Sequence, residues 1–468
     1  MCGVIGVLSA EGADVFTNVI EGLFQMQHRG QDACGVAISD GEVIRLRKAL
    51  GYVRQVFPAP PTADFEGSVA VGHVRYPTAG SNRVQNAQPH LLTDLTGTRW
   101  ALSSNGDVTN YREVRDELEQ AGVAFRGSND AELLLNFIAF GVISRGLELM
   151  AAIRAMQGRI RGAYSCVLMT RDEFYAIRDP HGFRPLCFGG EDGFWVVASE
   201  TNALDTNFVD LVDDVQPGEI VQFTRHGPTR HPHPDVVAAR DGREQAAHCV
   251  FEHVYFSRPD SIAFGQRVYD VRKRIGAQLS GENSTVADVV VPVPDSSIAA
   301  AMGYAQHANL PFEFGLIRNH YVGRTFISPD QVRRDEGVRQ KFNPIRSVFK
   351  DKRVVLVDDS IVRGTTLRKL VRMVRNQGAT EVHVSIGSPV TKHSCFYGVD
   401  TPNEDELIGA RLDVEGICKY IEADTLQYIS VEGLAFSVGD TGNYCNACFT
   451  GAYPVPVTEE KFERGDSE

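Results

Sequence analysis

The chain has 468 residues, of which 43% are hydrophobic and 23% charged, and its formal net charge at pH 7 is −13. This length exceeds what one hydrophobic core usually serves, so we expect two domains, and the acidic balance argues against nucleic-acid or polybasic membrane-surface binding. No run approaches about 18 consecutive apolar residues and no signal peptide pattern opens the chain, which predicts a cytoplasmic protein. In a reducing compartment the nine cysteines are not expected to form disulfides.

Short strand-like runs separated by turns fill the first half of the chain. They include CGVIGVLS, VAVGHVRY, YSCVLMTRD and FWVVAS, with helical patterns over about 16–27 and 130–140. This pattern predicts an α+β domain over residues 2–230, built of antiparallel sheet layered with helices. Residues 231–248 are rich in Pro, His and charge without an apolar period, which is typical of a linker.

Apolar strands alternating with helices characterise the second half. DVVVPVPDSS precedes a helical pattern from about Ile298, VVLVDDSIVRGTT precedes one that ends near Gly378, and EVHVSIGSP follows. Fully apolar strands followed by helices indicate parallel strands that are buried on both faces. We therefore predict an α/β domain with a parallel sheet over 249–457, followed by a charged tail over 458–468.

Cys2 follows directly on Met1, and removal of the methionine would leave the cysteine with a free α-amino group. Such an amine titrates near pKa ~7.7–8.0, so a usable fraction is unprotonated at neutral pH and accepts the thiol proton. The thiolate can then attack a carboxamide. Position 2 alone is weak evidence, because many proteins have a cysteine there by chance.

The motifs around and after Cys2 resemble those of the class II glutamine amidotransferases, which have an N-terminal-nucleophile fold with αββα layers. CGVIG matches the opening motif, and QHRGQD, HVRYPTAG, SSNGDV, SNDAE and RDPHGFRPL follow in that family's order. The resemblance implies that Cys2 is the nucleophile and that the Asn105 side-chain amide and the Gly106 backbone N–H form the oxyanion hole.

The same resemblance assigns the glutamine-binding residues. Arg75, with Thr78 nearby, is expected to hold the α-carboxylate, Asp130 the α-ammonium, and Arg29 to orient the region of the N-terminal amine. Three departures from the family pattern bear on glutamine affinity: Ser104 and Asp107 flank the oxyanion pair, and Pro77 stiffens the loop that carries Thr78.

The segment Val354–Thr366 is a hydrophobic strand that ends in two carboxylates and continues through a small-residue loop into a helix. Gly364 permits close backbone approach, and the loop N–H groups and hydroxyls can donate to a phosphate at the helix N-terminus. The segment resembles the fingerprint of the type I phosphoribosyltransferases. The residues expected to bind phosphoribosyl pyrophosphate are Asp358, Asp359, Ser360, Arg363, Gly364, Thr365 and Thr366.

A second strand end, Asp295–Ser297, matches the family's pyrophosphate and metal position, so Ser296, Asp358 and Asp359 are expected to hold Mg²⁺. The family's flexible loop corresponds to YVGRTFI, which contains Tyr321, Gly323, Arg324 and Thr325. We expect this loop to close over the site and exclude water. Arg318 and His320, just before it, depart from the family pattern.

Cys445 and Cys448 form a C-x-x-C pair, whereas Cys249 and Cys395 stand singly. By ligand type alone, four thiolates suit either structural Zn²⁺ or a 4Fe-4S cluster. The four match the cluster positions of the iron–sulfur branch of the glutamine phosphoribosylpyrophosphate amidotransferases, which favours iron in a structural role. Cys34, Cys166, Cys187 and Cys418 are interpreted as buried small hydrophobes.

The order of the two halves extends this resemblance over nearly the whole chain. It implies release of ammonia from glutamine, transfer through an interior channel to phosphoribosyl pyrophosphate, a homo-oligomer (a tetramer) and inhibition by purine nucleotides. Two alternatives stay open at this point. One is a related amidotransferase that acts on another phosphosugar, and the other is a regulatory protein that binds phosphoribosyl pyrophosphate without turning it over.

Overall fold

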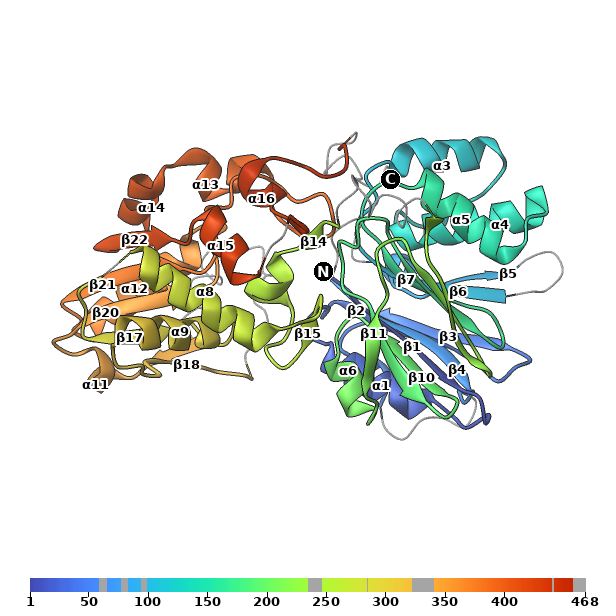
Figure 1. Cartoon of the computed structure of the whole chain (residues 1–468), viewed down its shortest axis with the longest axis horizontal. Helices are drawn as coiled ribbons and strands as arrows, with labels where there is room; N and C mark the ends of the chain where they lie inside the picture. Colours follow the sequence, from blue (N-terminus) through green and yellow to red (C-terminus); the bar gives the residue numbers. More distant parts are fainter. Residues whose placement is uncertain are drawn as a thin grey trace.

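The computed structural model describes residues 1–58, 65–76, 83–93, 99–234, 246–283, 285–321, 341–439 and 442–457. Its N-terminal half contains stacked antiparallel sheets, and its C-terminal half contains a parallel sheet between helices (Figure 1). The predicted order of an α+β half followed by an α/β half is confirmed. Several predicted positions lie outside the described residues, namely Pro77, Thr78, Gly323, Arg324, Thr325, residues 235–245 of the expected linker and the tail 458–468.

Two antiparallel sheets make up the framework of the N-terminal half. The first has the strand order β11-β9-β10-β1-β4-β2-β3. Its strands are β1 (Gly3–Ser9), β2 (Ala33–Ser39), β3 (Ile44–Leu50), β4 (Val69–Arg75), β9 (Cys187–Glu191), β10 (Phe194–Ala198) and β11 (Leu211–Asp214). The second has the order β13-β12-β8-β7-β6-β5. Its strands are β5 (His90–Thr93), β6 (Arg99–Asn105), β7 (Ser165–Met169), β8 (Phe174–Arg178), β12 (Ile220–Thr224) and β13 (Gly227–His231).

Alternation along the strands produces three stacked hydrophobic layers. On β1, Ile5 and Val7 face the helices α1 (Phe16–Gln25), α2 (Val53–Val56) and α6 (Asn202–Thr206), whereas Val4 and Leu8 pack between the two sheets. Helices α3 (Tyr111–Gln120), α4 (Asp130–Arg145) and α5 (Leu149–Arg159) cover the outer face of the second sheet. Because successive side chains of a strand point to opposite faces, this arrangement gives the αββα layers.

The predicted helices are present, and their ends follow local signals. Helix α4 begins at Asp130 as expected, where the Asn129 side chain accepts a hydrogen bond from Ala131 N. It runs past the expected end near position 140 and stops at Gly146, whose φ of +68° is left-handed. The first helix ends at Gln25, two residues earlier than the expected position 27.

A four-stranded parallel sheet forms the centre of the C-terminal half, with the order β17-β20-β21-β22. Its strands are β17 (Val289–Pro292), β20 (Arg353–Asp358), β21 (Glu381–Ile386) and β22 (Thr425–Tyr428). On β20, Val354 and Leu356 pack on the side of α12 (Thr365–Asn376) and α14 (Val414–Ile421). Val355 and Val357 face α8 (Val268–Glu282), α9 (Ile298–Ala308) and α15 (Val431–Ser437). The apolar strands are thus buried on both faces, as predicted.

Shorter elements complete this half. They are the strand pairs β14 (His248–Cys249) with β23 (Tyr444–Cys445), β15 (Ile262–Ala263) with β16 (Gln266–Arg267), and β18 (Leu316–Arg318) with β19 (Phe342–Pro344), together with α11 (Arg346–Phe349), α13 (Ile408–Arg411) and α16 (Ala447–Thr450). A π-helical turn spans Glu252–Phe256. Single-turn 3₁₀ segments lie at Val84–Asn86 and Glu404–Glu406.

The N-terminus lies at the junction of the two halves (Figure 1). The Met1 side chain is buried there, and its sulfur contacts Arg184 Nη1 at 2.7 Å. Arg184 also donates to the Tyr397 carbonyl oxygen across the junction, from Nε at 2.8 Å. The beginning of β1 is therefore held next to residues of both halves. In the part of the chain that the structure describes, no helix combines the length and apolar character needed to cross a bilayer.

Candidate active sites

Cys2 lies at the start of β1, which is paired on both sides, with β4 and β10. Its side chain is buried, its backbone N–H donates to Asn105 Oδ1 at 3.3 Å, and its thiol donates to the Tyr76 carbonyl oxygen at 3.5 Å. A strand in the middle of a sheet has little freedom to move. The thiol is therefore held at a fixed position beside the end of β6.

The end of β6 carries Asn105 and Gly106. Asn105 Nδ2 is a buried donor without a hydrogen-bond partner among the described residues, although its Oδ1 accepts from Cys2. Gly106 has a φ of +151°, and a Cβ there would lie 2.0 Å from the Ala163 carbonyl oxygen, so only glycine fits. An unpaired buried donor is costly unless a ligand completes it, and this one lies beside the thiol.

A small pocket opens at Cys2. It is lined by Cys2, Arg75, Tyr76, Gln88, Ser104, Gly106, Asp107, Asn129, Asp130 and Ala131. Burial lowers the pKa of Arg75, although Cys2 and Asp32 nearby oppose this effect. Asp130 begins α4, and its carboxylate accepts from Val108 N at 2.8 Å. The pocket thus presents a guanidinium, a carboxylate and a thiol, which suits an amino acid that bears both charges.

Arg29 does not line this pocket. Its guanidinium pairs with Glu200 in its own half and with Glu252 in the other half, and none of these side chains is more than 1% exposed. Its stem nevertheless approaches β1, because a Cβ on Gly3 would lie 3.4 Å from Arg29 Cδ. The stem of Arg29 thus lies near β1, while the direct contacts of its guanidinium are with two glutamates, and its role toward the N-terminal amine stays a prediction.

The second candidate site lies at the carboxyl end of β20. Asp359 accepts from the Ser296 hydroxyl at 2.5 Å and from the Ser360 hydroxyl at 2.6 Å, and Asp358 accepts from the Ser297 hydroxyl at 3.2 Å. Burial, reinforced by the charge of Asp359, raises the pKa of Asp358 well above its usual range, and burial also raises the pKa of Asp359. Two adjacent, partly buried carboxylates favour a cation between them and their ligand.

A small-residue loop joins these carboxylates to α12. Gly364 has a φ of +73° and directly precedes Thr365 and Thr366, the first two residues of the helix. The backbone N–H groups of a helix N-terminus are unpaired and attract phosphate. Arg363, expected at the same site, instead pairs with Glu406 at 2.7 Å on the surface. The loop geometry thus matches the predicted phosphate cradle, while Arg363 is engaged beside it.

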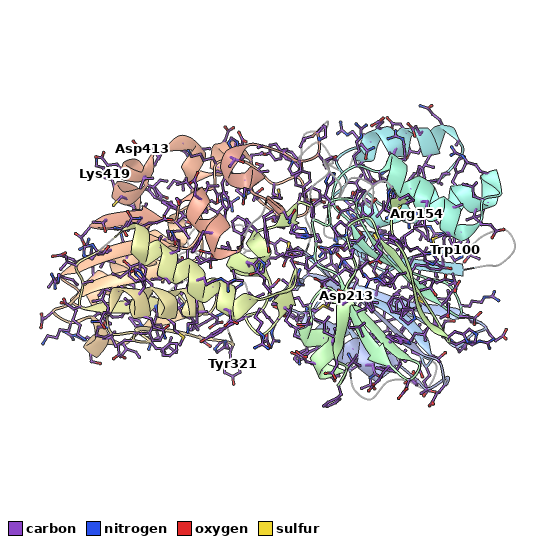
Figure 2. The ribbon with its side chains drawn as sticks, in the orientation of Figure 1. Trp100, Arg154, Asp213, Tyr321, Asp413 and Lys419 are labelled. Atoms are coloured by element: carbon purple, nitrogen blue, oxygen red, sulfur yellow. The ribbon has the colours of Figure 1, made fainter. Side chains whose placement is uncertain are left out.

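The segment after β17 lies next to the same sheet edge. Arg318 Nη1 donates to Asp295 Oδ2 at 2.5 Å, so a residue noted for its departure from the family pattern contacts a predicted pyrophosphate residue. Tyr321 is fully exposed, and Figure 2 shows its side chain projecting from the edge of the C-terminal half. Tyr321 is the first residue of the expected flexible loop, and the rest of that loop lies outside the described residues.

The four predicted ligand cysteines come from separate segments, and the structure brings them together. Cys249 on β14 and Cys445 on β23 are direct strand partners, and burial, reinforced by the neighbouring Cys395, Cys249 and Cys445, raises the pKa of Cys448 well above its usual range. However, the described residues contain no group of His, Cys, Asp or Glu side chains close enough to hold a single metal ion. Cys34, Cys166 and Cys187 are buried as interpreted, whereas Cys418 is only partly buried.

Sequence reasoning assigned no role to several residues at these sites. Gln88 and Tyr76 line the Cys2 pocket, and Gln88 accepts from Ser104 N at 2.7 Å, which fixes β6. Arg184 lies in RDPHGFRPL, a motif that matches the family but none of whose residues was given a role. Its contacts with Met1 and Tyr397 come from distant parts of the chain, so no local signal could have revealed them.

Comparison with known domain families identifies both halves. The glutamine amidotransferase domain family matches residues 77–206, and the phosphoribosyl transferase domain family matches residues 260–395. The two matches fall in the halves that contain the Cys2 pocket and the Asp358–Thr366 loop.

Whole-chain relatives share the same arrangement. The chain is 43% identical to amidophosphoribosyltransferase 2, chloroplastic, of Arabidopsis thaliana, over 99% of this chain and 81% of the relative. It is 42% identical to the amidophosphoribosyltransferase of Methanocaldococcus jannaschii, covering 98% of this chain and 99% of the relative. It also superimposes on the solved glutamine phosphoribosylpyrophosphate amidotransferase of B. subtilis, complexed with ADP and GMP, with a TM-score of 0.89, 40% identity and 98% coverage of both chains. The chain therefore belongs to the amidophosphoribosyltransferase family, enzymes of the first step of purine biosynthesis.

Proposed function

We propose that this enzyme converts glutamine, phosphoribosyl pyrophosphate and water into 5-phosphoribosylamine, glutamate and pyrophosphate. The observation that carries the proposal is the convergence of Cys2, Gly106, Arg75 and Asp130 on one pocket. In the other half of the same chain, a parallel strand ends at Asp358 and is followed by a phosphate-type loop. Family membership supports the same reaction.

The glutaminase step follows from the geometry around Cys2. Once Met1 is removed, the α-amine of Cys2 occupies the position from which its nitrogen now contacts Asn105 Oδ1. That amine accepts the thiol proton, and the thiolate attacks the glutamine carboxamide. The oxyanion then accepts hydrogen bonds from Asn105 Nδ2 and the Gly106 N–H. Arg75 and Asp130 hold the two charges of the glutamine backbone, and Thr78 and Arg29 are proposed to assist them.

The transfer step is proposed to take place at the end of β20. The Asp358 and Asp359 carboxylates hold the ribose hydroxyls, while the loop from Ser360 to Thr366 and the N-terminus of α12 hold the 5′-phosphate. The partly buried carboxylates and the Ser296 hydroxyl, which donates to Asp359, fit a Mg²⁺ ion, which would neutralise the pyrophosphate leaving group. Closure of the loop containing Tyr321 is proposed to exclude water, so that ammonia reaches the ribose through an interior channel.

We propose that Cys249, Cys395, Cys445 and Cys448 hold a 4Fe-4S cluster rather than a zinc ion, as the match of their positions to the iron–sulfur branch of the family implies. A cluster of four irons is larger than one ion, so its thiolates stand farther apart than those around zinc. Cys249 and Cys445 are strand partners, and Cys395 packs in one hydrophobic cluster with Cys445, which supports a group shared by these separate segments. When bound, the cluster would supply structural cross-links between β14, β23 and the segment at Cys395.

Two solved relatives bear on the regulation of the enzyme. The B. subtilis structure is described as complexed with ADP and GMP, and a second solved structure, with a TM-score of 0.90, is described as the allosteric regulatory enzyme of purine biosynthesis. We infer that purine nucleotides inhibit this enzyme, that it is a homotetramer and that it is cytoplasmic. The proposed domain limits are 2–230, a linker over 231–248, 249–457 and a tail over 458–468.

Product analysis tests the proposal directly. The purified protein, incubated with glutamine, Mg²⁺ and phosphoribosyl pyrophosphate, should release glutamate and pyrophosphate in equal amounts and form 5-phosphoribosylamine. Omission of phosphoribosyl pyrophosphate should abolish the amine product. Amination of a different phosphosugar in preference to phosphoribosyl pyrophosphate, or binding without turnover, would refute the assignment in favour of one of the two alternatives.

A further inference from the structure

A loop of the C-terminal half packs directly against the proposed oxyanion turn. Gly398, which has a φ of +98°, lies so close to Gly106 that a Cβ on Gly398 would stand 3.0 Å from Gly106 Cα and 3.1 Å from its carbonyl carbon. On its other side Gly106 is confined by the carbonyl group of Ala163, 2.0 Å from where a Cβ would stand. Gly106 is thus held between its own half and the transferase half.

The loop that carries Gly398 is itself fixed by several contacts. The Tyr397 carbonyl oxygen accepts from Arg184 Nε at 2.8 Å and from Nη2 at 2.5 Å. The Tyr397 ring stacks on Phe183 with centroids 4.3 Å apart, and its hydroxyl donates to the Val455 carbonyl oxygen at 2.6 Å. Tyr397 is 2% exposed, so these contacts are shielded from water. A loop anchored in this way can resist displacement of the turn that it covers.

The position of Gly106 matters because an oxyanion donor works only when its N–H is already aimed at the developing charge. We propose that Gly398 is a positioning residue for glutamine hydrolysis: the transferase half, through the loop at Gly398, holds the Gly106 N–H in its active geometry. The inference rests on the proposed glutaminase function of Cys2, Asn105 and Gly106. It makes efficient hydrolysis depend on docking of the two halves, which would limit release of ammonia when the halves are apart.

The test compares Gly398→Ala with Gly378→Ala. Gly378 lies in the same half and has the same φ of +98°, but a Cβ there meets only Lys350 at 3.5 Å, an ordinary contact. Both variants carry the same backbone strain, and only the first presses on the oxyanion turn. For Gly398→Ala we expect kcat for glutamine hydrolysis to fall by about 100-fold, as for an oxyanion donor displaced by an ångström, with KM for glutamine nearly unchanged.

Two readouts separate positioning from a general structural defect. Synthesis from added ammonia should stay at the level of Gly378→Ala, because it does not use the oxyanion hole. Alkylation of Cys2 by iodoacetamide should also proceed at the wild-type rate, because that reaction forms no oxyanion. Glutamine turnover in Gly398→Ala equal to that of Gly378→Ala would overturn the proposal.

A second variant tests the proposal if Gly398→Ala does not fold. Tyr397→Phe keeps the stacked ring and removes the hydroxyl contact with Val455. It should lower glutamine kcat about 3- to 10-fold without changing ammonia-dependent synthesis, because the hydroxyl loses both of its hydrogen bonds, one to the carbonyl oxygen and one from the N–H of Val455. Equal loss of both reactions would overturn the positioning role. Glutamine hydrolysis that survives Cys2→Ala in an otherwise unchanged enzyme would instead refute the proposed glutaminase site. The inference would then fail with it.

Discussion

Glu252 of the transferase half accepts a hydrogen bond from Arg29 Nη2 of the amidotransferase half at 2.6 Å, and neither side chain is exposed. Arg184 lies 3.6 Å from the other carboxylate oxygen of Glu252, and Glu200 pairs with Arg29 from the opposite side. Burial opposes ionisation of Glu252, but the two arginines outweigh it and hold the pKa of this carboxyl below its usual range. The junction therefore contains a buried network of two arginines and two glutamates.

Removal of one member should leave buried charges without partners. Glu252→Ala is expected to reduce the free energy of unfolding by about 3–5 kcal/mol, as measured by urea denaturation at pH 7. The control is Glu415→Ala, whose exposed pair with Lys419 should contribute less than about 1 kcal/mol. Equal stability of the two variants would contradict the cross-domain role of Glu252.

Cys2→Ala should abolish glutamine-dependent synthesis and leave ammonia-dependent synthesis largely intact, because the thiol acts only on the amide. The two rates are compared in the same preparation. Cys34→Ala is the control, since Cys34 is buried in the same sheet but does not line the pocket. Loss of the ammonia reaction in a folded Cys2→Ala protein would show that the two reactions are not divided between the halves.

Asp359→Asn should impair both reactions by at least ~10-fold, because each uses the same metal and ribose contacts. The control is Asp288→Asn. Asp288 directly precedes β17, at the amino end of the parallel strands, and it pairs with Arg353 on the surface. Steady-state rates with glutamine and with ammonia provide the measurement. If only the glutamine reaction were affected, the assignment of Asp359 to the transfer site would be wrong.

Anaerobically purified protein should be brown and contain about four irons per chain, whereas zinc would give colourless protein with one metal. Replacement of Cys249, Cys395, Cys445 or Cys448 by Ser should yield unstable protein, because the metal closes long loops. Cys418→Ser, in the same half, should keep the colour. Elemental analysis identifies the metal, and soluble, active protein without metal would exclude the structural role.

Acidification should weaken the amidotransferase half through His73. Burial, and then the charge of Arg75, lowers the pKa of His73 to about 3, whereas an unfolded histidine titrates near ~6.5. Between these values the unfolded state binds more protons, so stability is retained above about pH 6.5 and falls as the pH decreases.

His73→Gln removes this titration. Below about pH 6, the wild type should lose about 1.4 kcal/mol of unfolding free energy per pH unit more than the variant. Urea denaturation at a series of pH values measures both slopes. Parallel pH profiles would show that His73 does not have the depressed pKa.

The sequence by itself determined the features that depend on local pattern. The continuous apolar run of β20 specified a strand buried on both faces, and the following carboxylates, Gly364 and threonines specified a phosphate-type loop at a helix start. The helical pattern expected from position 130 placed the beginning of α4 correctly. These signals are local because turn geometry, capping and alternation are set by neighbouring residues.

Only the tertiary structure decided which distant residues meet. Arg29 was expected beside the N-terminal amine, but its guanidinium pairs with Glu252, 223 positions away. Gly398 contacts Gly106, and Arg184 contacts both Met1 and Tyr397, because the two halves pack against each other. Such contacts follow from the shapes of whole domains, and no periodicity or spacing within one segment encodes them. The side chains that pair with a buried charge or pack against a glycine come from segments far apart in the sequence, which only the fold brings together.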